Sequence, residues 1–369
     1  MVTSALDGFV IGVTADRRAD EQIELLARHG ARAVHGPTMR TLPLVADGGL
    51  RASTEALVAH PPDIVIANTA IGIRAWLSAA ESWGLGERLT DVLRDAQIVA
   101  RGPKAAGSLV TIGGEVAWRA PNGRLAEVVE YLRTRPLDGV RIASQRDGSD
   151  GDPAAAALRQ AGADVVEVAT YRWLRPADEA PALRLIEAVC ERTLDAVTFT
   201  SPAAVANLFA LADERGRSAE LRAACNDAVV AVCVGPVTQE AAVARGLAGA
   251  VAPARPLLGA MVNTVVDELR ERRVSLRLPA HDLELGGTVV RIDGDRIELT
   301  PREAAVLRSL AARAGVVVAK SALLRDVWGD AAADPHALEM TVSRLRRQLG
   351  NAGAALETVV RRGYVLRAR

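Results

Sequence analysis

An internal duplication between residues 8 and 255 constrains the fold of this chain more than any other feature. Each copy alternates short β-branched runs with longer Ala- and Leu-rich runs. Equivalent landmarks are Asp63 and Asp195, which are 132 residues apart, and Gly102 and Gly235, which are 133 residues apart. Strands that alternate with helices are typical of a parallel sheet covered by helices. We therefore expect two similar α/β lobes, with a ligand cleft between them outside the carboxyl ends of the strands.

Polar residues gather at the turns that lead from each apolar strand into the next helix. Helix N-termini carry unpaired N–H groups and positive potential, so such turns suit an anion, especially one with several carboxylates. The alternative for Thr69, Ser201 and Thr238 is that they only cap their helices, and the two roles are compatible. The candidate ligand-binding residues at these turns are Thr14, Arg17, Asn68, Thr69, Arg101, Lys104, Ser144, Thr200, Ser201, Gly235 and Thr238.

A helix with one apolar face and one arginine-rich face is predicted within residues 334 to 349. Apolar residues recur there at i, i+4, i+7 and i+11, which places on the buried side Leu338, Val342, Leu345 and Leu349. Thr341, Arg344 and Arg347 then point outward. An arginine can donate two parallel hydrogen bonds to guanine, and a short polar side chain can approach another base edge, so this face suits DNA. A surface helix with solvated arginines is the alternative.

The elements around this helix support the DNA-binding interpretation. Thr300 and Glu303 have the spacing of a capping box and start one helix, and a second helix follows it. Gly-Gly and Asp-Gly pairs before them mark two short hairpins. The expected order is strands, three helices and a terminal hairpin that contains Arg361 and Arg362.

This order resembles the OmpR/PhoB-type winged helix-turn-helix domain. The family pattern of an apolar-acidic-apolar triplet, a polar residue and an apolar-Ser-Arg-Leu-Arg run is matched by residues 338 to 346. The wing departs from the family, because Val360-Arg361 stands where an Arg-Gly pair is usual. Seven arginines and one acidic residue follow position 339, a net charge of +6 that suits phosphate contacts. The resemblance implies DNA contacts from Lys320, Thr341, Arg344, Arg346, Arg347, Arg361 and Arg362.

Residues 8 to 272 resemble uroporphyrinogen-III synthase in three short motifs. Residues 195 to 202 are similar to a family strand that ends in Thr-Ser or Phe-Ser, and residues 234 to 238 resemble its Gly-x-x-Thr turn. Residues 168 to 172 match the Val-x-x-Tyr crossover, whose tyrosine, here Tyr171, is the favoured proton donor in that family.

The resemblance implies two discontinuous lobes and no metal or organic cofactor. One lobe would contain residues 8–40 and 177–273, and the other residues 41–176. A short linker over residues 274–282 would lead to the winged helix domain at residues 283–369. The expected fold class is α/β, with two similar parallel-sheet lobes followed by a winged helix-turn-helix domain.

Departures from the synthase motifs favour anion binding over catalytic turnover. Asn68-Thr69 stands where the family has a Thr-Ser turn, Ala105 replaces a threonine, and Arg17 is displaced from the first turn. Loss of hydroxyl donors weakens the case for turnover but leaves anion binding, since backbone N–H groups, Arg101 and Lys104 remain. We therefore predict a transcriptional regulator whose synthase-like lobes sense a small anionic effector.

The chain also resembles fused regulators of nitrate and nitrite assimilation. Uroporphyrinogen III is the precursor of sirohaem, the cofactor of assimilatory nitrite reductase, which provides a chemical link between the two domains. The alternative function is an active synthase that closes hydroxymethylbilane while inverting its last ring. Tyr171 would then be the catalytic acid that assists loss of the hydroxyl, and the DNA-binding domain would be accessory.

Cysteine content and hydropathy complete these expectations. Cys190, Cys225 and Cys233 are odd in number and lack the spacing of metal ligands, which favours reduced core thiols and a cytoplasmic location. We recognise no signal peptide and no apolar run of ~18 residues, so we expect no membrane contact. The expected partners are double-stranded DNA and a small anionic ligand or linear tetrapyrrole. Binding to DNA as a homodimer or with a co-regulator is left open.

Overall fold

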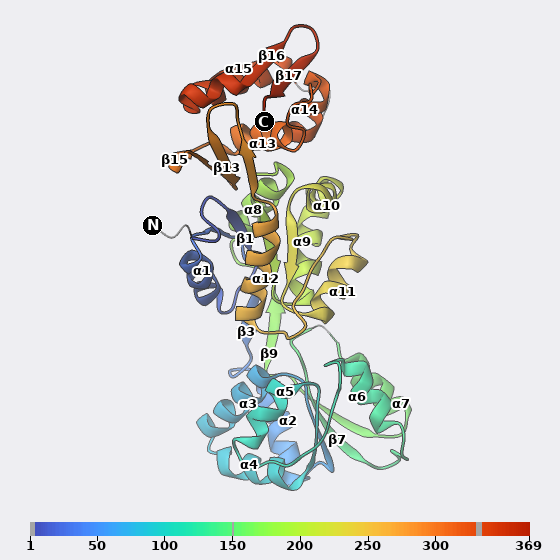
Figure 1. The fold of residues 1–369 in the computed structure, drawn as a ribbon. Coiled ribbons are helices and arrows are strands. Elements are labelled where there is room, and N and C mark those ends of the chain that lie inside the picture. Colours follow the sequence, from blue (N-terminus) through green and yellow to red (C-terminus); the bar gives the residue numbers. More distant parts are fainter. Residues whose placement is uncertain (1–3, 150, 330–333) are drawn as a thin grey trace. The chain divides into compact units, whose positions relative to one another are not determined.

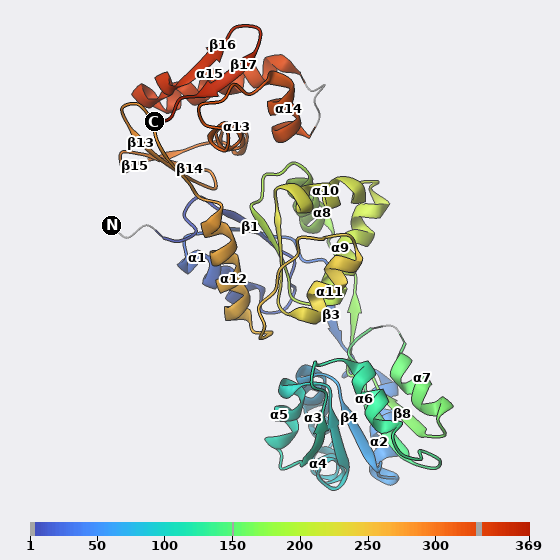
Figure 2. The same cartoon turned by 45° about the vertical axis from the view of Figure 1, so that its right-hand side comes forward.

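The computed structural model describes residues 4–149, 151–329 and 334–369. It divides into two compact units, drawn in Figures 1 and 2, of which the first contains Met1–Met39 and Pro176–Arg369 and the second Arg40–Arg175. The second unit differs by one residue at each boundary from the lobe expected over residues 41–176. Its ends pair as the antiparallel strands β3 (Arg40–Pro43) and β9 (Tyr171–Leu174). The first unit contains the remaining α/β lobe and the winged helix domain.

The second unit is built on a parallel sheet of short apolar strands. The strand order is β6-β5-β4-β7-β8, formed by Val116–Arg119, Gln97–Ala100, Ile64–Ala67, Arg141–Gln145 and Asp164–Val168. Helices cover both faces, because the central strands are apolar on both sides. One face packs against α2 to α5, which span Gly48–Ala59, Ala70–Ser82, Gly86–Asp95 and Pro103–Val110. The other face packs against α6 (Leu125–Leu132) and α7 (Pro153–Gln160), on the opposite side of the sheet in Figure 1.

The α/β part of the first unit has a parallel sheet assembled from segments that are distant in sequence. The strand order is β11-β10-β1-β2, formed by Val230–Cys233, Ala196–Phe199, Val10–Val13 and Arg32–His35. Helices α1 (Ala19–Arg28) and α12 (Leu258–Glu271) share one apolar core with β1 and β11. The remaining helices α8 to α11 span Ala180–Cys190, Pro202–Glu214, Ser218–Asp227 and Pro236–Ala244. Because the strands are parallel, their carboxyl ends lie at one edge of the sheet.

The winged helix domain begins with a four-stranded antiparallel meander. Strands β12 to β15 span Val274–Arg277, Asp282–Gly286, Val289–Ile292 and Asp295–Glu298. Helices α13 to α15 span Pro301–Ala311, Lys320–Trp328 and Pro335–Gln348, followed by the short helix η1 (Gly350–Ala355). The wing is the hairpin β16 (Leu356–Val359) and β17 (Gly363–Leu366). The expected capping box is present, with Thr300 and Glu303 exchanging hydrogen bonds at the start of α13.

The segment expected as a linker has a different structure. Val274–Arg277 forms strand β12, which pairs along its whole length with β13. Val274 and Leu276 pack against the core of the winged helix domain, and this burial explains why the segment is a strand of that domain. Helix α12 ends at Glu271, so two residues separate it from β12.

The three cysteines are buried in the first unit. Cys190, Cys225 and Cys233 are free thiols. Burial raises the pKa of Cys190 to about 11 and the pKa values of Cys225 and Cys233 to about 12. At neutral pH these side chains are core thiols and poor nucleophiles. Among the residues that the structure describes, no helix is both long and apolar enough to span a membrane.

Candidate functional site

The carboxyl ends of β4 and β7 form a polar edge in the second unit. Thr69 follows β4 and is the N-cap of α3, where its hydroxyl accepts a hydrogen bond from Gly72 N at 3.1 Å. The Thr69 N–H donates to Gln145 Oε1 at 2.8 Å, and the Thr69 hydroxyl lies 3.2 Å from that of Tyr171. A Cβ on Gly72 would collide with the Gln145 amide. Thr69 is therefore both a helix cap and the centre of a cluster with Gln145 and Tyr171.

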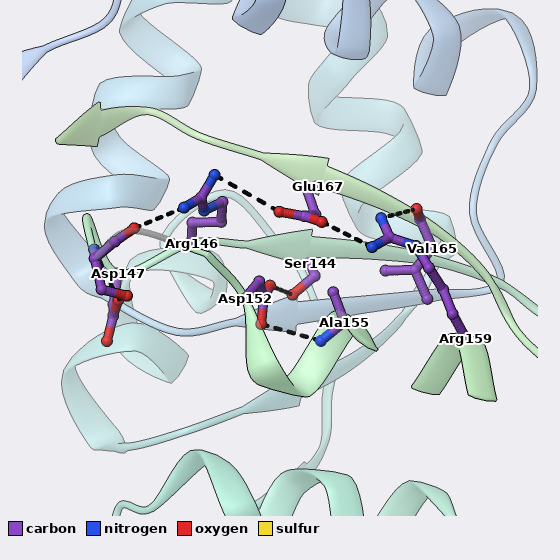
Figure 3. A network of polar contacts seen from close by, with 9 residues as sticks. Ser144, Arg146, Asp147, Asp152, Ala155, Arg159, Val165 and Glu167 are labelled. Carbon is purple, nitrogen blue, oxygen red and sulfur yellow. Dashed lines mark hydrogen bonds and ion pairs between the residues drawn. The ribbon is translucent and has the colours of Figure 1, made fainter. Parts of the chain in front are cut away.

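The arginines beside this cluster are held by carboxylates. Arg101, which follows β5, lies 3.5 Å from an oxygen of Asp147. Arg146 lies 3.6 Å from Glu167, which also pairs with Arg159 at 2.8 Å, and Figure 3 shows Glu167 between these two arginines. The carboxylates offset part of the positive charge at this edge. An anion that binds here would compete with Asp147 for Arg101.

Ser144 and Asn68 are buried at the ends of β7 and β4. Ser144 is 1% exposed and donates at 2.8 Å to Asp152, the N-cap of α7, as Figure 3 shows. Asn68 is 5% exposed, and its side-chain oxygen has no hydrogen-bond partner among the described residues. A buried acceptor without a partner costs about 1–3 kcal/mol. Ser144 therefore supports the start of α7, whereas Asn68 retains an unused acceptor.

In the first unit the corresponding hydroxyls are used inside the sheet. Thr14 is fully buried, and its hydroxyl donates to Thr198 O at 2.7 Å. The Thr198 hydroxyl donates to Gly12 O at 2.8 Å and accepts from Gln22 Nε2 at 2.7 Å. Thr14 therefore ties β1 to β10 and presents no free hydroxyl donor to a ligand. Arg17 is exposed at the turn that follows.

Helix capping accounts for part of the polar residues after β10. The Ser201 hydroxyl accepts from Ala204 N at 3.2 Å and caps α9, beside the partly exposed Thr200. The capping role considered for Thr69 and Ser201 is thus present in the structure. Thr238, in contrast, is 3% exposed and does not cap α11.

Two helix N-termini at matching places of the duplication lack a side-chain cap. Gly235 is the N-cap of α11, and its counterpart Gly102 is the N-cap of α5. A proline follows each glycine at the first helical position, and the next residue of α5 is the exposed Lys104. Neither N-cap glycine has a side chain that could accept from the first turn, and the positive end of such a helix suits an anion.

The structure groups the predicted residues differently from the sequence pattern. It brings Thr69, Arg101 and Tyr171 to one edge of the second unit and leaves Thr14 in the core of the first. Gln145 and Asp147, which the sequence analysis did not select, complete this edge. The available signal was their position beside Ser144, at the end of an apolar strand and in the turn that follows it. In the described part of the chain, no group of three His, Cys, Asp or Glu side chains could hold a metal ion.

Helix α15 presents the predicted polar face. Leu338, Val342, Leu345 and Leu349 are buried as the periodicity predicts. Arg344 and Arg347 are exposed and form no ion pair with a described residue. Thr341 is partly buried, and its hydroxyl donates to Ala337 O at 2.7 Å. The two arginines are therefore free to reach phosphates or base edges.

Two other cations of the predicted set are engaged within the domain. Arg346 donates from Nε to Leu356 O and from Nη2 to the Thr358 hydroxyl, each at 2.7 Å. Arg346 thus fixes β16 to the recognition helix, and these donors are not free for a base. Lys320 forms an ion pair of 2.5 Å with Glu339 on α15, which lowers the pKa of Glu339 and raises that of Lys320.

The wing exposes its arginines at a tight turn. Arg361 and Arg362 are exposed, and Val360 beside them is 79% exposed. Arg361 has a φ of 57°, the left-handed region that favours glycine. It stands where the winged helix pattern has a glycine, so the turn keeps its conformation at a cost in backbone strain. A Cβ on Gly363 would collide with Val318 O, which explains the glycine before Tyr364.

Comparisons with known proteins identify both regions. The family model described as uroporphyrinogen-III synthase HemD matches residues 20–263, and the model described as transcriptional regulatory protein, C terminal, matches residues 294–366. A putative uroporphyrinogen-III synthase of Methanothermobacter thermautotrophicus is 27% identical over 263 residues, which are 69% of this chain and 96% of that protein.

One solved structure matches the synthase-like region, and one regulator matches the DNA-binding region. The crystal structure of a mutant uroporphyrinogen III synthase from Thermus thermophilus matches with a TM-score of 0.60 and 26% identity, over 71% of this chain and 99% of that chain. The transcriptional regulatory protein KdpE of Mycobacterium tuberculosis is 35% identical over 88 residues, which are 24% of this chain and 38% of that protein.

Proposed function

The chain belongs to the uroporphyrinogen-III synthase family and joins its synthase-like domain to an OmpR/PhoB-type DNA-binding domain, and we propose that it is a transcriptional regulator that senses a small anionic effector. The observation that carries this proposal is the exposed face of α15, where Arg344 and Arg347 have no ion-pair partner among the described residues. A synthase that acts only on tetrapyrroles has no use for such a face.

The helix caps and the hydrogen bonds of the hydroxyl groups support anion binding without turnover. The N-cap residues Gly102 and Gly235 have no side chain that could cap their helices, and the positive end of each helix suits a carboxylate or a smaller anion. The Thr14 hydroxyl is committed to Thr198 O, and Ala105 offers none. The helix N-termini could therefore still bind an anion, whereas neither Thr14 nor Ala105 offers a free hydroxyl for acid catalysis.

The effector that suits these turns best is a tetrapyrrole carboxylate. Uroporphyrinogen III leads to sirohaem, the cofactor of assimilatory nitrite reductase, so a regulator of this kind would control nitrate or nitrite assimilation. Nitrate and nitrite themselves are the smaller anions to compare. Binding to DNA as a homodimer or with a co-regulator is part of the same proposal.

One observation favours the second candidate, an active synthase. The Tyr171 hydroxyl lies 3.2 Å from that of Thr69 at the carboxyl edge of the sheet, and the family resemblance assigns this tyrosine the role of proton donor. Tyr171 would then assist loss of the substrate hydroxyl, while the fold of the site orients the ring that is inverted. Its side chain is 4% exposed, so a substrate could reach the hydroxyl only if neighbouring groups moved.

Incubation of the full chain with hydroxymethylbilane separates the two functions. The regulator should yield only the type I product of spontaneous closure, and uroporphyrin III should change its affinity for DNA in a gel-shift titration. Type III product at ~1 s⁻¹ or faster would establish the synthase instead. Tyr171→Phe should then lower turnover more than binding, whereas Tyr131→Phe, a change in a ring stacked on Trp118, is the matched control.

A further inference from the structure

A carboxylate at the start of β10 connects the α/β lobe of the first unit to its winged helix domain. Asp195 Oδ2 accepts a hydrogen bond from Val10 N on β1 at 2.8 Å. Asp195 Oδ1 lies 3.7 Å from Nη2 of Arg308 on α13, and the carboxylate is 15% exposed. Arg308 also donates to Gly287 O at 2.9 Å. One buried carboxylate therefore links β1, β10 and the first helix of the DNA-binding domain.

A second connection lies at the start of β1. Gly8 O accepts from the backbone N of Thr288 at 2.8 Å and from its hydroxyl at 3.0 Å. Asp7 forms an ion pair of 2.8 Å with Arg291 on β14. Gly8 and Gly287 both have positive φ values, 87° and 56°, and a Cβ on Gly287 would collide with the Gly8 backbone. The two backbones therefore approach as closely as only glycine permits.

A third contact involves the turn just before β10. The Arg192 guanidinium lies against the end of α14, where a Cβ on Gly329 would be 2.9 Å from its Nη1 atom. None of these three contacts uses Thr341, Arg344 or Arg347, so the DNA-binding face of α15 takes no part in them.

The contacts and the effector turns are at opposite ends of the same two strands. Asp7 and Asp195 precede β1 and β10, whereas Thr14 and Thr200 follow them. Each strand is four residues long, roughly 13 Å at about 3.3 Å per residue. The two strands are also paired in register and tied by the Thr14 hydroxyl. A displacement at one end is therefore transferred along a short, fully hydrogen-bonded path.

We propose that β1 and β10 transmit the state of the effector turns to the DNA-binding domain through the contacts at Gly8 and Asp195. The proposal rests on the proposed sensing function and names its route. It contrasts with a flexible tether, in which the DNA-binding domain would not respond to the lobe. The two residues between α12 and β12 are too few for such a tether.

Linkage allows this route to be tested without knowledge of the effector. Coupling between two sites is reciprocal, so DNA binding must change effector affinity by the same factor as an effector changes DNA affinity. If β1 and β10 carry this coupling, the effector turns should respond to DNA even when no effector is present. The experiment measures backbone hydrogen exchange of the full chain with and without a duplex selected from genomic fragments. We expect the duplex to slow exchange ~5-fold or more in peptides that cover residues 14–18 and 200–204.

Variants at the contacts decide whether β1 and β10 are the route. Arg308→Ala removes the Asp195 and Gly287 contacts but keeps the Gly8–Thr288 contact, so it should reduce the slowing at both turns, most at residues 200–204, while protection of α15 by DNA persists. Arg313→Ala is the control, because Arg313 pairs at 2.9 Å with Asp326 inside the winged helix domain. Thr288→Val, which loses the hydroxyl bond to Gly8 O, serves if the first variant misfolds and should reduce the slowing.

The outcomes separate this route from the sensing function. Protection of α15 by DNA without any change at the turns overturns the transmission, and so does a response that is undiminished in Arg308→Ala. If the turns respond to DNA in the predicted way but no tetrapyrrole, nitrate or nitrite binds the chain, the route stands and the proposed effector class is wrong.

Discussion

Each copy of the duplication has an aspartate that accepts the same kind of backbone hydrogen bond, but the two aspartates have different surroundings. Asp63 Oδ2 accepts from Arg141 N at 2.8 Å, and Asp195 Oδ2 accepts from Val10 N at the same distance. In both units an aspartate at the start of one strand thus satisfies the first N–H of its parallel neighbour. Asp63 is exposed, whereas Asp195 is covered and lies near Arg308. The strand-start contact that is local at Asp63 is therefore also a connection to the winged helix domain at Asp195.

The opposite ends of the strands differ as well. In the second unit, Thr69 caps a helix and lies beside Gln145 and Tyr171 at the sheet edge. In the first unit, Thr14 points its hydroxyl to Thr198 O inside the sheet. The second unit therefore has a polar cluster at the edge of its sheet, whereas the first unit uses the Thr14 hydroxyl inside its sheet.

Removal of the two aspartates should give the largest difference between the copies. Asp195→Ala leaves Val10 N, which is covered at the start of β1, without its acceptor and removes the carboxylate near Arg308, so we expect a loss of about 2 kcal/mol in the free energy of unfolding. Asp63→Ala should cost about 1 kcal/mol, since water can replace an exposed acceptor. Urea unfolding followed by circular dichroism measures both. Equal losses would show that the winged helix domain adds nothing at Asp195.

DNA affinity should depend on one unit alone when no effector is bound. Arg344→Ala should weaken binding to a specific site by about 1–3 kcal/mol and relax base choice, because it removes a donor from the recognition helix. Arg101→Ala, a change in the second unit, should leave the affinity unaltered. A gel-shift titration at fixed salt compares the two. A comparable loss in Arg101→Ala would mean that the second unit contacts DNA.

The two threonines should separate stability from binding. Thr14→Val should lower the free energy of unfolding by about 1–2 kcal/mol, because the buried Thr198 O loses a donor. Thr69→Val should cost about 1 kcal/mol through loss of the α3 cap and should also weaken uroporphyrin III binding. Thermal unfolding and a fluorescence titration report the two effects. Weaker uroporphyrin III binding in Thr14→Val would place that hydroxyl in the site despite its burial.

The buried thiols of the first unit should give the smallest effect, a pH dependence of the free energy of unfolding. Burial raises the pKa of Cys233 to about 12, so at alkaline pH its thiol ionises in the unfolded chain before it does in the folded one. Its contribution is complete below the unfolded pKa near 9 and is lost as the pH rises towards 12. From pH 8 to 10 this loss is about 1 kcal/mol. Cys233→Ala, although less stable at pH 8, should lose less stability over this interval in urea titrations.

Much of the architecture could be predicted because its signals are local. The spacing of Leu338, Val342 and Leu345 determines which face of α15 is buried, and the Thr300–Glu303 pair determines where α13 begins. Alternating runs at a constant offset predicted the α/β lobes. These patterns depend on helix and strand periodicity, which the chain expresses within a few residues.

The function of individual polar residues was decided by tertiary structure. Thr14 meets an acceptor 184 residues away, and Gln145 reaches a backbone N–H 76 residues away. Arg346, for which the family resemblance implies a DNA contact, donates to the wing, a partner that its position on the helix does not reveal. A side chain with several donors can satisfy them in many ways, and local sequence does not specify which partner the fold brings within hydrogen-bond distance. The sequence alone determined the elements and their buried faces, whereas packing of distant segments decided which hydroxyls and guanidiniums find partners within the fold.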